Sequence, residues 1–181
     1  MIPRGRTTRS MFALSLAVGI AAWAAFFSPR AMAAEDDARA IVSVVSTFYK
    51  NYTASLRKSF AGAKDDYDFR KQPEADASFV RKIETLIADA QKSEYGALEY
   101  DPILMAQDVP TGMRYAKPVI KDGSAELIAY TLWDGGSKHA ICVSLAKKDT
   151  TWRIIDVTDM EDEDTKRECG GMKASGKASK P

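Results

Sequence analysis

Two carboxylates and an amide lie close together in residues 101–108, which read Asp-Pro-Ile-Leu-Met-Ala-Gln-Asp. Hydrolases use paired carboxylates as general acid and base, so Asp101 and Asp108, with Gln107 beside them, are candidate ligand-binding or acid–base residues. A structural interpretation also exists. Asp101 can cap a short turn that starts at Pro102, and Gln107 and Asp108 can bond to loop backbone. We favour the structural interpretation and leave the binding role open.

Other residues that could carry chemistry form no recognisable catalytic or metal-binding pattern. The single histidine, His139, follows a Gly-Gly-Ser turn, whereas a general base needs a partner and a shielded position. One His and two separated Cys do not make a zinc site, and the chain lacks the Gly-rich loops that bind phosphates. Asp65-Asp66-Tyr67-Asp68 lacks the Gly and the distal Glu of a calcium loop. We therefore predict no metal and no cofactor, and name no catalytic residue.

Two aromatic residues are candidates for contact with a ligand or partner. Tyr130 and Trp133 lie near the end of a strand predicted at residues 124–133, on opposite faces. Exposed aromatic side chains are enriched in protein interfaces, but aromatic side chains in sheets more often pack in the core. Both interpretations stay open.

The periodicity of apolar residues predicts the elements that must position these side chains. Apolar residues recur at three- and four-residue steps in two segments, which predicts two helices, and Asp76 or Ser78 can cap the second. From Met113 the period changes to two, and short Gly- and Asp-containing turns separate the segments, which predicts hairpins. The fold class is therefore α+β, with two N-terminal helices packed on a curved four-stranded antiparallel meander. The predicted helices span residues 35–60 and 76–94, and the predicted strands span residues 114–119, 124–133, 138–146 and 151–157.

The N-terminus has the parts of a secretory signal peptide. Three Arg within the first nine residues precede an apolar run, 11–27, and an Ala-Met-Ala sequence ends at Ala33. We predict that residues 1–33 are the signal peptide, cleaved near Ala33, and that the protein is periplasmic or secreted with no stable membrane span after cleavage. The alternative is a retained anchor, since an apolar run of about 17 residues is at the lower limit for a span.

Cleavage would also change the charge. The whole chain has 26 basic and 25 acidic residues, and residues 1–33 hold four Arg and no acid, which leaves 22 against 25 and a net charge of −3. A nucleic-acid-binding protein needs a basic face, so we predict no nucleic-acid partner. Residues 34–160 suit one α+β domain, and residues 161–181, which begin with an acidic run and consist mostly of Gly, Ser, Ala and Lys beyond Cys169, are predicted to be a disordered tail.

The two cysteines, Cys142 and Cys169, are a candidate disulfide, because an even count in an oxidising compartment favours pairing. On the predicted strand 138–146, Cys142 points away from Ile141 and Val143, so it could reach the tail. The bridge would close a loop of about 28 residues and add roughly 3–4 kcal/mol. The alternative is two unpaired thiols.

The sequence also carries a family resemblance. Asp101-Pro102-Ile103-x-x-Ala106-Gln107-Asp108, followed by a meander that closes on Trp152-Arg153-Ile154, resembles domain-of-unknown-function family 3828 over about residues 38–158. Its members are small exported bacterial proteins, often lipoproteins, whereas this chain has no Cys near the cleavage site for acylation. The family is similar in fold to the nuclear-transport-factor-two-like superfamily, which implies a cone between a long helix and a bent sheet.

The resemblance implies no single function, because that superfamily includes isomerases, dehydratases, immunity proteins and binding modules. Our first hypothesis is a non-enzymatic periplasmic domain that binds a protein partner or a small ligand, for example an immunity protein that neutralises a toxin. The second is an envelope enzyme with Asp101 or Asp108 as base in a cone-shaped pocket. The third is a structural accessory of the cell envelope.

Overall fold

The computed structural model describes residues 29–92, 98–160 and 169–170. The chain divides into two compact units, 1–36 and 37–181, and of the first only the start of a helix is described. The apolar run of the predicted signal peptide lies outside the described residues. Within them, no helix has the length and apolar character that a membrane crossing requires.

The first predicted helix is present as α1 (Pro29–Phe60), which begins six residues before the predicted start and ends where predicted. Ile41, Val45, Phe48 and Tyr49 form a fully buried stripe along it, because residues three and four apart share one face of a helix. The ring of Phe48 stacks on that of Tyr52 at 6.1 Å between centroids. Phe48, Tyr49 and Tyr52 of α1 therefore belong to the core.

The second helix, α2 (Ala77–Lys92), follows a short 3₁₀ turn, η2 (Phe69–Lys71). Asp76 caps it: its Oδ1 accepts hydrogen bonds from the backbone N–H of Ser78 at 2.9 Å and from its hydroxyl at 2.7 Å. Asp76 also joins α2 to the sheet, since its N–H donates to the carbonyl of Ile154 at 2.9 Å and its carboxylate pairs with Lys148. Of the two predicted caps, Asp76 is the one used.

Asp76 is expected to stabilise the fold in a pH-dependent way. The Lys148 ammonium and the donors of Ser78 hold its pKa far below the usual value, so its contribution is present above the unfolded-state pKa of about 3.9 and is lost as the pH falls below it. We expect Asp76→Asn to lower the free energy of unfolding by about 1 kcal/mol at pH 7, mostly through loss of the charge that pairs with Lys148, because asparagine keeps an acceptor oxygen for the cap. The difference from wild type should shrink below about pH 4 in urea titrations.

The exposed Asp66 supplies the matched control for Asp76, and Asp66→Asn should leave stability within about 0.5 kcal/mol at every pH. A loss in Asp76→Asn that does not change with pH would argue against the ionised cap.

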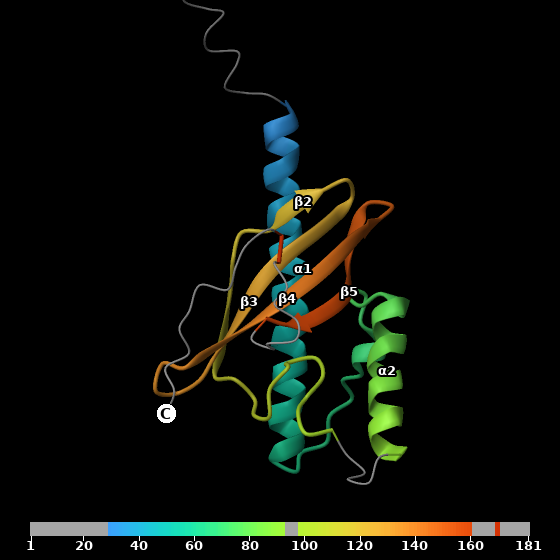
Figure 1. Ribbon diagram of the computed structural model, residues 1–181, viewed down its shortest axis with the longest axis vertical. Helices are drawn as coiled ribbons and strands as arrows, with labels where there is room; N and C mark the ends of the chain where they lie inside the picture. Colours follow the sequence, from blue (N-terminus) through green and yellow to red (C-terminus); the bar gives the residue numbers. More distant parts are fainter. Residues whose placement is uncertain (1–28, 93–97, 161–168, 171–181) are drawn as a thin grey trace, which may run out of the picture. The chain divides into compact units, whose positions relative to one another are not determined.

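The sheet is antiparallel throughout, curled and open, with strand order β1-β3-β4-β5 and β2 also paired with β3 (Figure 1). The prediction of four strands needs one correction. The strand expected at 114–119 is divided, because Ala116, Lys117 and Pro118 interrupt it and Pro has no N–H for a sheet ladder. The strands are β1 (Gly112–Tyr115), β2 (Val119–Lys121), β3 (Ser124–Leu132), β4 (Lys138–Lys148) and β5 (Thr151–Asp159).

The two faces of the sheet bury different clusters. Ile141, Val143 and Leu145 of β4 pack with α1 and α2 in the main core, whereas Ala140 and Cys142 belong to a smaller cluster on the opposite face. This alternation confirms the predicted orientation of Cys142. The smaller cluster holds Ile128, Ala140, Cys142, Met160 and Cys169, and we call it the outer cluster.

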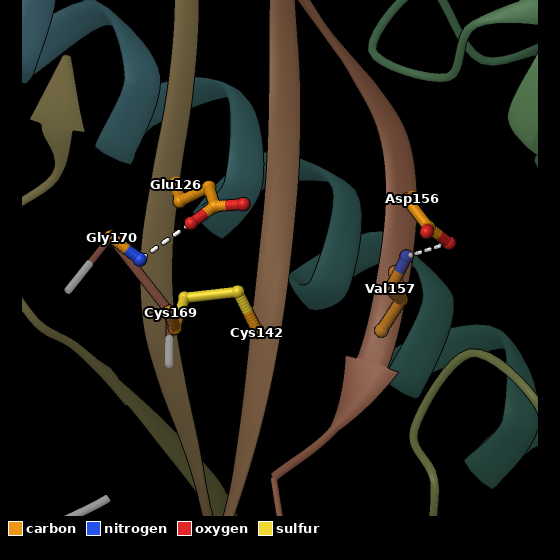
Figure 2. Close-up of a disulfide and its surroundings, with 6 residues drawn as sticks. All are labelled: Glu126, Cys142, Asp156, Val157, Cys169 and Gly170. Atoms are coloured by element: carbon orange, nitrogen blue, oxygen red, sulfur yellow. Dashed lines mark hydrogen bonds between the residues drawn. A yellow bond between two sulfur atoms is a disulfide. The ribbon is translucent and has the colours of Figure 1, made fainter. Parts of the chain in front are cut away.

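Cys142 and Cys169 form a disulfide, with a Cα–Cα distance of 5.6 Å (Figure 2). Of the predicted tail, only Cys169 and Gly170 lie within the described residues, and Cys169 is fully buried. The N–H of Gly170 donates to Glu126 Oε2 on β3. Gly170 has φ +59°, and a Cβ there would lie 2.8 Å from that of Val119, so only glycine fits. The Cys169–Gly170 segment is thus attached to β3 and β4.

Candidate functional site

Asp101, the first candidate residue, organises a compact turn. Its Oδ1 accepts hydrogen bonds from the N–H groups of Ile103 at 2.8 Å and Leu104 at 2.9 Å. Its own N–H donates to the carbonyl of Ala106 at 2.8 Å. This is the capping role that the sequence indicated, and it leaves Ile103 and Leu104 buried in the main core.

Two tyrosines of α1 attach this turn to the helix. The hydroxyl of Tyr52 donates to Asp101 Oδ2 at 2.6 Å, and that of Tyr49 donates to the carbonyl of Ile103 at 3.1 Å. Burial, followed by the Asp101 charge, raises the pKa of Tyr52 well above its usual value, and burial does the same for Tyr49. Both hydroxyls therefore stay protonated donors. Both Asp101 oxygens accept hydrogen bonds within the fold.

Gln107 and Asp108 lie on the surface. Among the described residues, no hydrogen bond joins either side chain to the loop backbone, in contrast to the structural role that we favoured for them. Neither they nor Asp101 line the two cavities described below. Among the described residues, Asp101 and Asp108 therefore share neither of these two cavities.

Tyr130 and Trp133 are both half-buried at the β3–β4 hairpin. Tyr130 packs against the outer cluster, and the Lys138 ammonium lies 5.2 Å from the centre of its ring. The backbone N–H of Trp133 donates to the carbonyl of Ser137 within the turn. His139, on the same hairpin, lies 3.3 Å from an oxygen of Asp159. None of these residues lines either of the two cavities described below, so Tyr130 and Trp133 remain separate candidates for partner contact.

A concave site does exist between α1 and β1, and the sequence analysis did not identify it. This α1–β1 groove has a volume of about 290 Å³. One wall is a stripe of α1, and the other is β1 with the residues just before it. The lining residues are Ser46, Tyr49, Lys50, Thr53, Arg57, Pro110, Thr111, Gly112, Met113 and Tyr115.

The charges of the α1–β1 groove all have one sign. Lys50 and Arg57 are basic, and none of the described lining residues is acidic. The Arg57 Nη2 donates to the carbonyl of Pro110, which joins the end of α1 to the opposite wall. Among the described residues, the Lys50 ammonium has no carboxylate partner. The groove is therefore a cationic recess.

A second cavity, of about 510 Å³, lies beside the Cys169–Gly170 segment. Exposed residues of the β2–β3 hairpin form most of its lining, so it is a surface depression. Ligand atoms of Glu126, Cys142 and Cys169 lie within 4.8 Å of one another here. Metal ions bind thiolates, however, and both sulfur atoms are committed to the disulfide. The lining residues are Val119, Lys121, Asp122, Ser124, Ala125, Glu126 and Gly170.

The signal that could have indicated the α1–β1 groove is a polar stripe on α1. Ser46, Lys50, Thr53 and Arg57 recur at steps of four, three and four, which places them on one helical face beside the buried stripe. A polar stripe on a helix is most often its solvent face, so this spacing alone does not distinguish a groove wall from an ordinary surface.

Comparisons with known proteins support the fold but indicate no activity. A solved protein of unknown function from Bacteroides thetaiotaomicron is similar in structure, with a TM-score of 0.51 and 18% identity over 72% of this chain and 97% of that chain. A chain of the type VI effector-immunity complex Tae3-Tai3 from Ralstonia pickettii has a TM-score of 0.43 and 15% identity over 65% of this chain and 94% of that chain. No protein-family model and no curated protein matches the sequence. The α+β fold is thus shared with the Bacteroides protein.

Proposed function

We propose that this chain is an exported, non-enzymatic domain that binds a protein partner, and that the α1–β1 groove receives an anchoring side chain of that partner. The observation that carries the proposal is the groove itself. Two elements far apart in sequence enclose it, and its exposed cations lack carboxylate partners among the described residues. Interfaces gain most of their affinity from a few side chains that fill such recesses.

The hydrogen bonds of Asp101 and the position of Asp108 favour a binding function over the envelope-enzyme hypothesis. A general base must reach its substrate from a cavity wall. Both oxygens of Asp101 are used within the fold, and Asp108 lines neither cavity. The described lining of the α1–β1 groove contains hydroxyls and cations but no acidic residue or histidine to accept a proton near neutral pH.

The size of the groove favours a protein partner over a small ligand. Pockets that enclose a drug-sized molecule occupy about 300–1,000 Å³. At about 290 Å³, the groove lies at the lower limit of that range and suits one side chain. The larger depression beside Gly170 is built mostly from exposed hairpin residues, which makes it a weaker enclosure.

Export is part of the proposal. The disulfide is of the kind that persists in the periplasm or outside the cell, and it agrees with the predicted signal peptide. Membership of domain-of-unknown-function family 3828 and the nuclear-transport-factor-two-like relationship stay predictions. One specific form of the proposed function is immunity, in which the groove engages a toxin that reaches the periplasm.

The groove can be filled without disturbing the core, which gives a direct test. Ser46 lies on α1, and its hydroxyl bonds only to the carbonyl of Ser43 in the preceding turn. We expect Ser46→Phe to occupy the groove and abolish recovery of a stoichiometric partner when the protein is used for affinity capture from its native envelope extract. Mass spectrometry identifies the partner, and circular dichroism checks the fold.

Ser43→Phe is the matched control, because Ser43 is exposed on the same helix and does not line the groove. This variant should recover the same partner as the wild type. Equal recovery by Ser46→Phe, or recovery of no stoichiometric partner by the wild type, would overturn the proposal.

A further inference from the structure

The neutral hydroxyls of the α1–β1 groove have already donated their hydrogens within the protein. Tyr49 donates to the carbonyl of Ile103 at 3.1 Å, and Thr53 donates to the carbonyl of Tyr49 at 2.8 Å. Ser46 and Thr111 likewise donate to backbone carbonyls, at 3.1 Å and 3.0 Å. The Tyr115 hydroxyl donates to the weak acceptor Met113 Sδ at 3.7 Å, so the strongest side-chain hydrogen-bond donors left to a ligand are the cationic groups.

Lys50 and Arg57 supply those remaining donors. The Lys50 ammonium carries three N–H donors with no partner among the described residues, and Arg57 uses Nη2 for Pro110 and retains others. Seven residues apart on α1, they share one helical face, with backbones about 10 Å apart, and Thr53 lies between them. A group that accepts hydrogen bonds and carries negative charge would satisfy both cations at once.

We propose that the α1–β1 groove binds a carboxylate side chain of an acidic segment of the protein partner, held between Lys50 and Arg57. This inference rests on the proposed function and names the chemistry of the partner's anchor. A carboxylate fits because a guanidinium fork pairs with it through short charge-assisted hydrogen bonds. Within the part of the chain that the structure describes, no carboxylate of the groove lining competes for these cations.

The volume of the groove limits the size of the partner group that can enter it. A groove of about 290 Å³ encloses a single side chain, so the partner's backbone lies at the mouth and its carboxylate enters. Electrostatic attraction of this kind acts mainly on partner choice and association rate, and salt weakens it at exposed positions. The binding is therefore expected to weaken as ionic strength rises.

A minimal probe tests the chemistry without knowledge of the partner. N-acetyl-glutamate methylamide is titrated into the ¹⁵N-labelled protein with its disulfide intact, beside the neutral glutamine analogue and inorganic phosphate. We expect the glutamate probe to shift the amide signals of Lys50, Thr53, Arg57 and residues 111–115, with the glutamine analogue about tenfold weaker. Equal binding of the two analogues, or shifts by phosphate alone, would overturn the carboxylate assignment.

Charge variants locate the binding. Lys50→Gln should weaken the glutamate probe about tenfold, and Lys50→Arg should restore it, because Arg keeps the charge and the donors. Lys64→Gln is the matched control, since Lys64 is exposed and does not line the groove, and it should bind as the wild type does. Unchanged binding by Lys50→Gln would overturn the inference.

The affinity capture separates failure of this inference from failure of the proposed function. Loss of the partner in both Ser46→Phe and Lys50→Gln supports both. Loss in Ser46→Phe with full retention in Lys50→Gln keeps the groove as the binding site and overturns the acidic anchor. Retention in both overturns the proposed function together with the inference.

Discussion

Replacing both cysteines by alanine, Cys142→Ala with Cys169→Ala, is expected to lower the free energy of unfolding by about 3–4 kcal/mol. The bridge joins residues separated by 27 positions, so in the unfolded chain it restricts a long loop. Alanine is the better replacement than serine, because both sites are buried and a hydroxyl there would need a hydrogen-bond partner. Urea titration measures the loss, and the melting temperature should fall by about 10 °C.

The variant should still fold, which makes the loss measurable. The main core contains Phe48, Phe79 and Leu127 and does not include either cysteine. Without the bridge, the Cys169–Gly170 segment loses its covalent attachment to β4, whereas the hydrogen bond from Gly170 to Glu126 remains. Far-ultraviolet circular dichroism should therefore match the wild type, whereas the stability falls.

Chemical reduction provides the control for the cysteine variant. Reduction of the wild-type protein should reproduce the stability of the double variant, and the same treatment should not change the double variant further. A loss below about 1 kcal/mol in both experiments would show that the bridge contributes little and that the contacts of Gly170 hold the segment.

Local patterns in the sequence predicted the elements well because each pattern has one physical cause. The buried stripe of α1 follows from helical spacing, and the orientation of Cys142 follows from alternation on a strand. The start of α1 was less predictable. Pro29 is a favourable first residue of a helix, but the sequence analysis assigned it to the end of a signal peptide.

Local sequence patterns did not predict two features: the division of the first predicted strand and the α1–β1 groove. β1 and β2 both pair with β3, so two short edge strands share one partner, and a continuous alternation across Pro118 does not show where the pairing stops. The groove needs α1 and β1 side by side, although they are distant in sequence. Contacts between distant segments depend on the whole packing arrangement, which local periodicity does not contain.

Asp101→Ala is the second change with a large expected effect, a loss of about 2–4 kcal/mol in the free energy of unfolding. The substitution removes the acceptor of three hydrogen bonds: two from the N–H groups of Ile103 and Leu104, and one from the hydroxyl of Tyr52. Buried donors without partners cost about 1–3 kcal/mol, and the lost cap alone costs about 1 kcal/mol. Urea titration of the purified protein measures the change.

Two further variants, Asp101→Asn and Tyr52→Phe, separate the stability contributed by the hydrogen bonds of the turn from that contributed by the Tyr52 hydroxyl. Asparagine keeps one oxygen for the N–H groups of the turn, so its loss should be smaller than that of alanine. In a double-mutant cycle, the Tyr52–Asp101 pair should show a coupling energy of at least about 0.5 kcal/mol, because both side chains share one hydrogen bond.

Asp108→Ala is the matched control for the opening motif, since Asp108 is exposed and should change stability by less than about 0.5 kcal/mol. Similar losses for the Asp101 and Asp108 variants would contradict the hydrogen-bond assignment. The expected contrast separates two carboxylates that the sequence presents as a pair. Asp101 holds the turn against α1, and Asp108 faces solvent and is free to contact a partner.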